Sequence, residues 1–171
     1  GIKDLKKLVE LFFDDDGFPL NRNSSDLFEI SKFLILIKDA IKDAQKYVPE
    51  FLEKIVEKNI ANLNYLLSPN HNLPLFNGTK INNLEEYIKY LKSQDYKIKK
   101  VDKIIGNIQV LKNKKCHVFF DTGSPPKKGF LESYQAGPLS FEYYFENEKV
   151  ITNCGFGSGI SKKAILLSRL S

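Results

Sequence analysis

Apolar residues as far as Leu67 recur at intervals of three and four, the period of amphipathic helices that bury one face. The pattern predicts a helix over residues 3–13, which ends in an acidic turn closed by Gly17 and Pro19. It predicts a second helix after a cap at Ser24 or Ser25, and a third that begins at Pro49. Long helices with short joints indicate antiparallel packing, and we interpret the apolar stripe of the second helix as core. That stripe consists of Leu27, Ile30, Leu34, Ile37, Ile41, Ala44 and Val48.

Beyond a polar loop over residues 68–83 and a short helix over 84–92, the spacing changes from helical to alternating. Strands are predicted over residues 104–111, 116–121, 139–145 and 150–154, and the last two form a hairpin. Helices followed by strands predict an α+β fold with a boundary near residues 94–103. We therefore expect a helical domain over residues 1–94 and a β domain over 95–171 that lacks strands needed for a complete sandwich.

Composition places the chain among ordinary globular proteins. It has 171 residues, of which 42% are hydrophobic and 27% are charged, so disorder and a disulfide scaffold are disfavoured. There is no Met and the chain opens at Gly1, so we expect an internal fragment of a longer protein. The longest apolar run, residues 33–37, is too short to cross a bilayer.

Positive charge is concentrated in one part of the chain. The net charge is +5, yet residues 89–128 hold 11 Lys against three Asp, a local net of +8. This segment either attracts a polyanion or protects strand edges with lysines. Only two of the basic residues are Arg, the side chain suited to reading bases, so a nucleic-acid partner is not expected.

Few residues carry recognisable chemistry on their own. Cys116 and Cys154 lack metal-ligand spacing and are interpreted as small buried thiols. The chain has two histidines, His71 and His117, and they provide almost no basis for predicting a zinc site or a Ser-His-Asp triad. We therefore predict no metal and no cofactor, and we keep His71, in its polar loop, as a candidate functional residue.

Four ordered segments carry more information than any single residue. The first is Asp16-Gly17 with Arg22-Asn23, and the second is SPNHNLPLFNG over residues 68–78. The third is DTGSPP over residues 121–126, and the fourth is the hairpin AGPLSFE, residues 136–142, with VITNCG, residues 150–155. In this order the segments resemble those of the heparinase II/III superfamily of polysaccharide lyases, in a divergent bacterial branch. The resemblance implies the C-terminal part of an α/α toroid followed by the start of an antiparallel β-sandwich domain.

The resemblance also implies a reaction and a set of residues. Such lyases cleave uronate-containing polysaccharides by β-elimination, which needs a neutralised carboxylate, a base for the C5 proton and an acid for the leaving oxygen. Catalytic roles would fall on Arg22, Asn21 and Tyr134, with Arg22 pairing with the uronate carboxylate. Contacts to an acidic polysaccharide would come from Gln135, His71 and Asp16.

This chain departs from the family pattern at four positions. Asn21 stands where relatives carry Glu, and Pro19 and Gln135 stand where they carry His. Asp26 occupies the position of a catalytic Tyr. The acid/base set is therefore depleted, which favours either a contribution from other parts of a longer protein or a repurposed relative.

Three alternatives stay open at this stage. The first is a non-catalytic glycan-binding or structural module on the same fold, and the second is a nucleic-acid-binding domain built on strand aromatics. The third is local, because Arg22 could instead form a structural ion pair with Asp16 or Asp26. The compartment, periplasm or cytoplasm of a bacterium, is not decided by the sequence.

Overall fold

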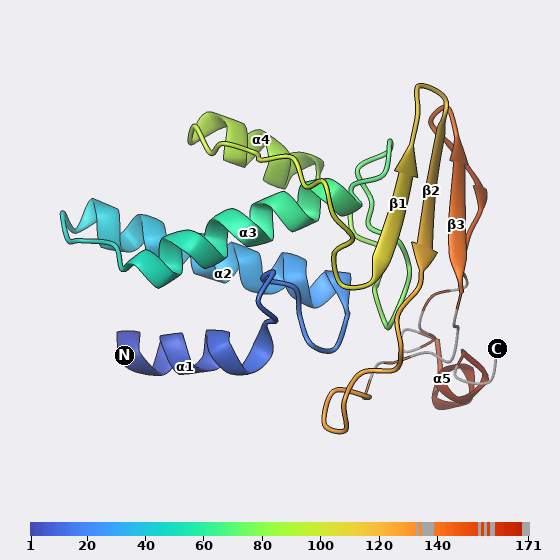
Figure 1. The fold of residues 1–171 in the computed structure, drawn as a ribbon, viewed down its shortest axis with the longest axis horizontal. Helices are drawn as coiled ribbons and strands as arrows, with labels where there is room; N and C mark the ends of the chain where they lie inside the picture. The colour runs from blue at the N-terminus through green and yellow to red at the C-terminus, as the bar shows by residue number, and fades with distance from the viewer. Residues whose placement is uncertain (133, 135–138, 154, 156, 158–159, 169–171) are drawn as a thin grey trace.

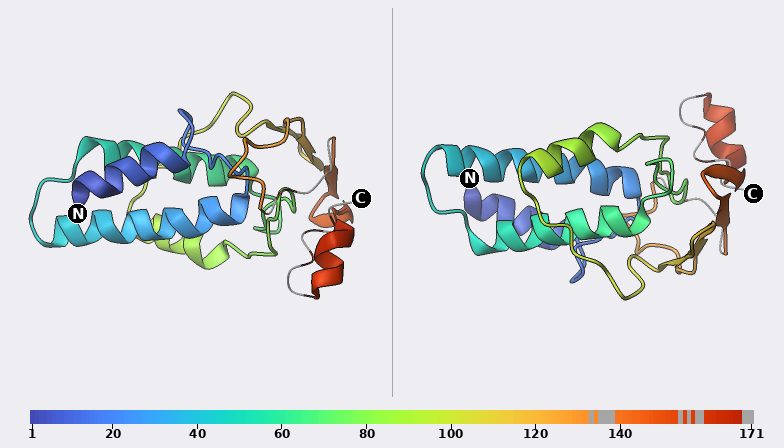
Figure 2. Two further views of the ribbon diagram at one scale, coloured as in Figure 1. Left: turned by 90° about the horizontal axis from the view of Figure 1, so that it is seen from below. Right: turned by 90° about the horizontal axis from the view of Figure 1, so that it is seen from above.

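The computed structural model describes residues 1–132, 134, 139–153, 155, 157 and 160–168. The first four helices are gathered on one side of the molecule and a sheet stands across their end, with the last helix on the side of the sheet (Figure 1). The N-terminus lies at the end of the helices that is remote from the sheet, as both turned views confirm (Figure 2). The elements in chain order are α1 (Ile2–Phe12), α2 (Ser24–Asp43), α3 (Glu50–Leu66), α4 (Glu85–Ser93), β1 (Ile108–Lys112), β2 (Cys116–Asp121), β3 (Phe141–Phe145), β4 (Glu148–Ile151) and α5 (Lys162–Ser168).

The predicted helices are present, with corrections at their ends. The side chain that caps α2 is Asn23, which accepts from the backbone N–H of Ser25 at 2.9 Å, so the expected cap at Ser24 or Ser25 was wrong by one residue. Helix α2 ends at Asp43 rather than Val48, since Gln45 adopts a left-handed φ of 54° that breaks the helix. Val48 nevertheless stays buried at 7% exposure, as Leu27 and Leu34 are. Ile30, Ile37 and Ile41 pack against this core, whereas Ala44 is exposed, so the prediction for Ala44 was wrong.

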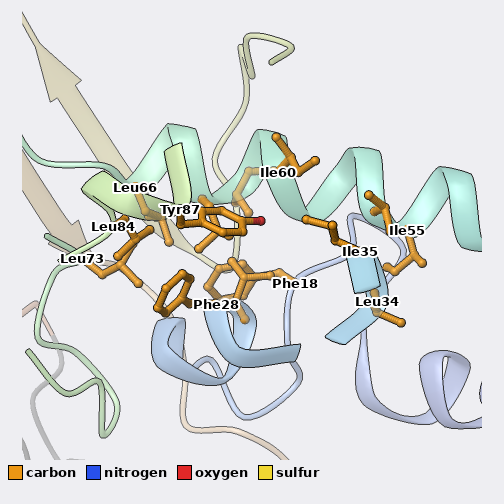
Figure 3. Packing of buried hydrophobic residues seen from close by; sticks show 14 of the residues in the cluster. Phe18, Phe28, Leu34, Ile35, Ile55, Ile60, Leu66, Leu73, Leu84 and Tyr87 are labelled. Carbon is orange, nitrogen blue, oxygen red and sulfur yellow. The ribbon is translucent and has the colours of Figure 1, made fainter. Parts of the chain in front are cut away.

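The helical core lies between α2 and α3 and is closed by α4 (Figure 3). Phe28 of α2 meets the ring of Tyr87 of α4 edge-on, with 5.2 Å between centroids. The Tyr87 hydroxyl lies 2.7 Å from Ser31 Oγ, and burial raises the pKa of Tyr87 to about 12. This buried polar contact fixes the position of α4 on α2 within an otherwise apolar core.

The sheet is antiparallel and has the order β1-β2-β3-β4. Strand β1 starts at Ile108 rather than residue 104, because Gly106 and Asn107 both adopt left-handed φ values, 55° and 56°, that turn the chain. Strand β4 ends at Ile151, earlier than expected, and the closing helix α5 was not predicted. Cys116 is half-buried, with its Sγ 3.4 Å from the Tyr143 hydroxyl, whereas Cys154 lies outside the described residues.

Helix α3 docks on the edge of the sheet through polar contacts. The Tyr65 hydroxyl donates to the carbonyl of Ile108 at 3.0 Å and accepts from the N–H of Val110 at 3.2 Å, as a neighbouring strand would. Lys112 returns from β1 to donate to the carbonyls of Tyr65 and Leu67 at 3.0 and 3.1 Å. A cation at a helix C-terminus satisfies orphan carbonyls, and partial burial lowers the pKa of this lysine.

The structure thus confirms a mixed fold of helices and an antiparallel sheet. That the helices form the end of a toroid, and that a domain boundary lies at residues 94 and 95, stay predictions. Among the described residues no helix is long and apolar enough to cross a membrane.

Candidate functional site

Arg22 lies at the centre of the junction between helices and sheet and is only 6% exposed. Its Nε donates to the carbonyl of Gly106 at 3.0 Å and its Nη1 to the carbonyl of Ser124 at 3.1 Å. Its Nη2 forms an ion pair with Asp121 Oδ1 at the end of β2. Asp121 is the partner, and neither of the expected structural partners, Asp16 or Asp26, pairs with Arg22. One guanidinium therefore joins the helical half, the linker and the β half.

Asp121 is bound as fully as Arg22. Its Oδ1 also accepts from the backbone N–H of Gly123 at 3.0 Å, and its Oδ2 accepts from Asn77 Nδ2 at 3.0 Å. Asn77 belongs to the polar loop between α3 and α4 and adopts a left-handed φ of 52°. We refer to Arg22, Asp121 and Asn77 as the junction cluster.

Glycine is required where the chain passes over the arginine. A Cβ added to Gly123 would lie 2.2 Å from Arg22 Cζ, far inside van der Waals contact. Gly106 is equally constrained, because a Cβ there would lie 2.2 Å from the Phe18 ring. The glycine of the DTGSPP segment thus has a packing reason, which is to let the backbone lie on the guanidinium.

Asn21 is held beside Asp26 at the start of α2. Its Oδ1 accepts from the backbone N–H of Asn23 at 3.0 Å, and its Nδ2 donates to Asp26 Oδ2 at 2.6 Å. Both residues are partly exposed. The carboxamide is therefore oriented by the protein, and one hydrogen of Nδ2 remains for a ligand.

Tyr134 is within electrostatic reach of the junction cluster. Burial raises the pKa of its phenol, the charge of Asp121 raises it further, and the charge of Arg22 lowers it. A neutral phenol at the edge of a buried ion pair is suited to donating a proton. Gln135, the neighbouring candidate, lies outside the described residues.

The other two candidates lie elsewhere. Asp16 pairs with Lys103 on the linker, and its backbone carbonyl accepts from Asn62 Nδ2 at 2.9 Å. His71 adopts a left-handed φ of 59° in the polar loop, and its carbonyl accepts from the N–H of Leu84 at 2.8 Å. The charge of Arg22 therefore acts on the pKa of Tyr134. Among the described residues no hydrogen bond or ion pair joins Tyr134, Asp16 or His71 to Arg22.

Glu142 was not singled out in the sequence although it is fully buried in β3. Its Oε1 accepts from Lys149 Nζ at 2.8 Å and from the backbone N–H groups of Leu75 and Asn153, each at 3.2 Å. Glu142 thus holds the polar loop on β3 as Asp121 holds it on β2. The one signal in the sequence that could have indicated burial of Glu142 is the alternation along β3, which places Glu142 on the same face of the sheet as Tyr144. The described residues contain no group of three or more side chains suited to a metal ion.

The β part of the chain matches a known protein family. Residues 105–166 match the model of the family described as heparinase II/III-like, C-terminal. The match covers the sheet, the DTGSPP segment and Tyr134, and it confirms the resemblance predicted from the sequence motifs. No curated protein sequence matches the chain.

Solved structures then give particular proteins to which the fold is similar. Heparan sulfate lyase HepC from Pedobacter heparinus matches over 97% of this chain and 30% of its own, with 14% identity and a TM-score of 0.71. The heparinase III-BT4657 gene product matches over 99% of this chain and 30% of its own, with 16% identity and a TM-score of 0.77. The chain thus spans about 30% of the length of these structures, and at such identities the likeness shows the fold alone.

Proposed function

We propose that this protein is a polysaccharide-lyase-like protein that cleaves an acidic, uronate-containing glycan by β-elimination. The observation that carries the proposal is the junction itself, where Arg22 from the helical half lies in electrostatic reach of Tyr134 from the β half. The family match of residues 105–166 and the fold shared with heparan sulfate lyases support the same reaction.

In this reaction the C5–H bond breaks and its proton goes to a base, which leaves the electron pair on C5. This pair forms the C4–C5 double bond as the C4–O bond breaks, and the leaving oxygen, which takes the electrons of that bond, receives a proton from an acid. Tyr134 is the proposed acid because a phenol is protonated at neutral pH and the charges of Arg22 and Asp121 both act on its pKa. The free N–H of Asn21, together with Gln135, would hold the uronate carboxylate.

Arg22 takes a positioning role in this proposal, since three protein groups already occupy its guanidinium. A uronate carboxylate would have to displace Asp121 to reach it. Asp16 and His71 remain proposed as contacts for more distant sugar units.

The test uses the intact protein and polymers such as heparan sulfate, and it follows the ultraviolet absorbance of the unsaturated product. Tyr134→Phe should lower kcat by about 100-fold or more, the usual contribution of a positioned acid. Tyr47→Phe is the matched control, because Tyr47 is 85% exposed. Equal rates for Tyr134→Phe and wild type would exclude Tyr134 as the acid.

A second function is favoured by one observation. The Asn21 carboxamide is engaged by Asp26 and the Arg22 guanidinium by Asp121, so the groups expected to neutralise a carboxylate are largely committed to the protein. We therefore keep a non-catalytic glycan-binding module as the alternative. Salt-sensitive binding of a uronate polymer with no new absorbance would establish this alternative and overturn the lyase.

A further inference from the structure

Two side chains dock the end of helix α3 on strand β1 (Figure 1). The Tyr65 hydroxyl donates to the carbonyl of Ile108 and accepts from the N–H of Val110. Lys112 Nζ donates to the carbonyls of Tyr65 and Leu67. We refer to these four hydrogen bonds as the α3–β1 dock. Lys112 is its charged member, so the strength of the dock depends on the charges that lie near this ammonium group.

His117 lies directly opposite Lys112, on β2. Paired residues of an antiparallel ladder share one face of the sheet, so the imidazole and the ammonium group are neighbours on the face toward α3. Tyr144 follows on β3, opposite His117, and is fully buried. The imidazole Nδ1 is buried as well, and none of the described residues forms a hydrogen bond with it. His117 therefore lies between a cation that α3 holds in place and a buried phenol.

These surroundings favour the neutral imidazole. Burial lowers the pKa of His117, and the charge of Lys112 lowers it further. In the protonated form both ring nitrogens carry a hydrogen, so the buried Nδ1 would become a donor for which the described residues provide no acceptor. Lys112 can move away from the new charge only by giving up its bonds to the carbonyls of α3.

The other titratable groups around this face supply no compensating negative charge. These groups are Tyr65 of α3, Glu142 and Tyr144 of β3, Lys149 of β4, and Lys115 and Glu146 at the turns. Glu142 is paired with Lys149 at 2.8 Å, and Glu146 with Lys115 at 3.8 Å. Burial raises the pKa of both tyrosines, so their phenols carry no charge at neutral or acidic pH. Protonation of the imidazole therefore adds a second positive charge beside the ammonium group.

We propose that His117 makes the α3–β1 dock sensitive to pH, because the protonated imidazole repels Lys112 and weakens the bonds of Lys112 to the end of α3. Folding lowers the pKa of His117, so the unfolded chain binds the proton more tightly. The dock is therefore at full strength above about pH 6.5, the ordinary pKa of histidine, and weakens as the pH falls below it. Asp121, at the other end of β2, keeps its ion pair with Arg22, so the sheet loosens at one end only. The inference is independent of the proposed function.

The experiment measures hydrogen exchange of the Val110 amide by NMR in the intact protein, labelled with nitrogen isotope at valine. Val110 reports on the dock because its N–H donates to the Tyr65 hydroxyl at 3.2 Å. After correction for the intrinsic effect of pH on exchange, its protection should fall about 3- to 10-fold between about pH 7.5 and about pH 5.5, as expected for one new like-charge contact. His117→Gln should abolish this fall, since a carboxamide carries no charge at either pH.

His71→Gln is the matched control, because His71 is the other histidine of the chain, and it should keep the full fall. Lys112→Gln should reduce the fall, since it removes the repelled charge but keeps a donor for the carbonyls of α3. Lys114→Gln, in the exposed turn next to it, should behave as wild type. An undiminished fall in His117→Gln or in Lys112→Gln would overturn the proposal, because either the imidazole or its repulsion of Lys112 would then not be the cause.

Discussion

The helical half and the sheet half of this protein both bury apolar residues, but they differ in the carboxylates that they bury. Between α2 and α3 the core is aliphatic and aromatic, with Leu27 and Leu52 fully buried. On the sheet, the face toward the helices carries Asp121 and Glu142, exposed only 3% and 0%, whereas Phe141 and Phe145 on the other face are about two-fifths exposed. The helices are thus held together mainly by apolar packing. The sheet packs on them through Ile108, Phe119 and Tyr144, which are fully buried, and adds the two buried carboxylates to this apolar face.

This difference indicates that hydrogen bonds and the buried ion pair fix how the sheet sits on the helices. Apolar packing tolerates exchange of residues of similar size, whereas a buried ion pair requires both partners and a defined distance. Asp121 and Glu142 hold the same loop from adjacent strands, through Asn77 and through the N–H of Leu75. The polar loop between α3 and α4 is therefore the element that sets the sheet on the helices.

The largest expected effect comes from removing one partner of the junction pair. Arg22→Ala should lower the free energy of unfolding by about 3–5 kcal/mol, because it leaves Asp121 charged and buried. Urea unfolding measures this. Lys54→Ala, which breaks the exposed pair with Glu50, is the control and should leave stability nearly unchanged.

Replacing both partners sharpens the comparison. The double variant Arg22→Met, Asp121→Leu should be far less destabilised than Arg22→Ala, since no charge is left without a partner. A double variant that is as unstable as Arg22→Ala would show that the contacts to Gly106 and Ser124, rather than the ion pair, hold the junction.

In the helical half the equivalent change acts by leaving a cavity. Leu52→Ala should cost about 2–5 kcal/mol, because Leu52 is fully buried between α3 and its neighbours. Leu8→Ala on α1 serves as the control, because Leu8 is 63% exposed. If Leu52→Ala were tolerated like Leu8→Ala, the apolar description of the helical half would be wrong.

Gly123→Ala tests how closely the backbone lies on the guanidinium. The added Cβ would lie 2.2 Å from Arg22 Cζ, so overpacking should cost about 1–3 kcal/mol. In the Arg22→Ala background the same substitution should cost much less, since the obstructing group is gone. Equal losses of stability in the two backgrounds would show that the added Cβ is not obstructed by the Arg22 guanidinium.

The sequence predicted the helical half of the fold more completely than the sheet. The stripe from Leu27 to Val48 predicted the helical core, since one period and one face are sufficient to define a packed helix. The strands of the sheet were also predicted from their alternation. Their orientation was not, because Phe141 and Glu142 alternate equally well whichever face is buried.

The candidate site was predictable in part for a related reason. Arg22 and the DTGSPP segment were singled out separately, yet they meet across 99 residues of sequence, and only the fold shows that Asp121 is the partner. Long-range ion pairs leave no periodic signal, so the junction cluster could not be derived from local pattern.

The smallest expected effect concerns Asp14, in the turn that follows α1. Partial burial raises the pKa of this carboxyl, more than the two backbone bonds to Asp16 and Phe18 lower it. A raised pKa in the folded state means that Asp14 favours folding at low pH, and that this contribution is lost as the pH rises through the folded-state pKa.

Asp14→Asn keeps a neutral side chain at every pH, so it should be slightly more stable than wild type at about pH 7 and lose that advantage near about pH 3. The gain should be no more than about 0.5 kcal/mol, because the carboxyl remains accessible to solvent. Urea unfolding of both proteins at the two pH values measures it. A variant less stable than wild type at neutral pH would show that the charged oxygen's bonds to the turn outweigh its loss of solvation. The turn after α1 would then be built around a charged Asp14, as the junction is built around the ion pair of Asp121.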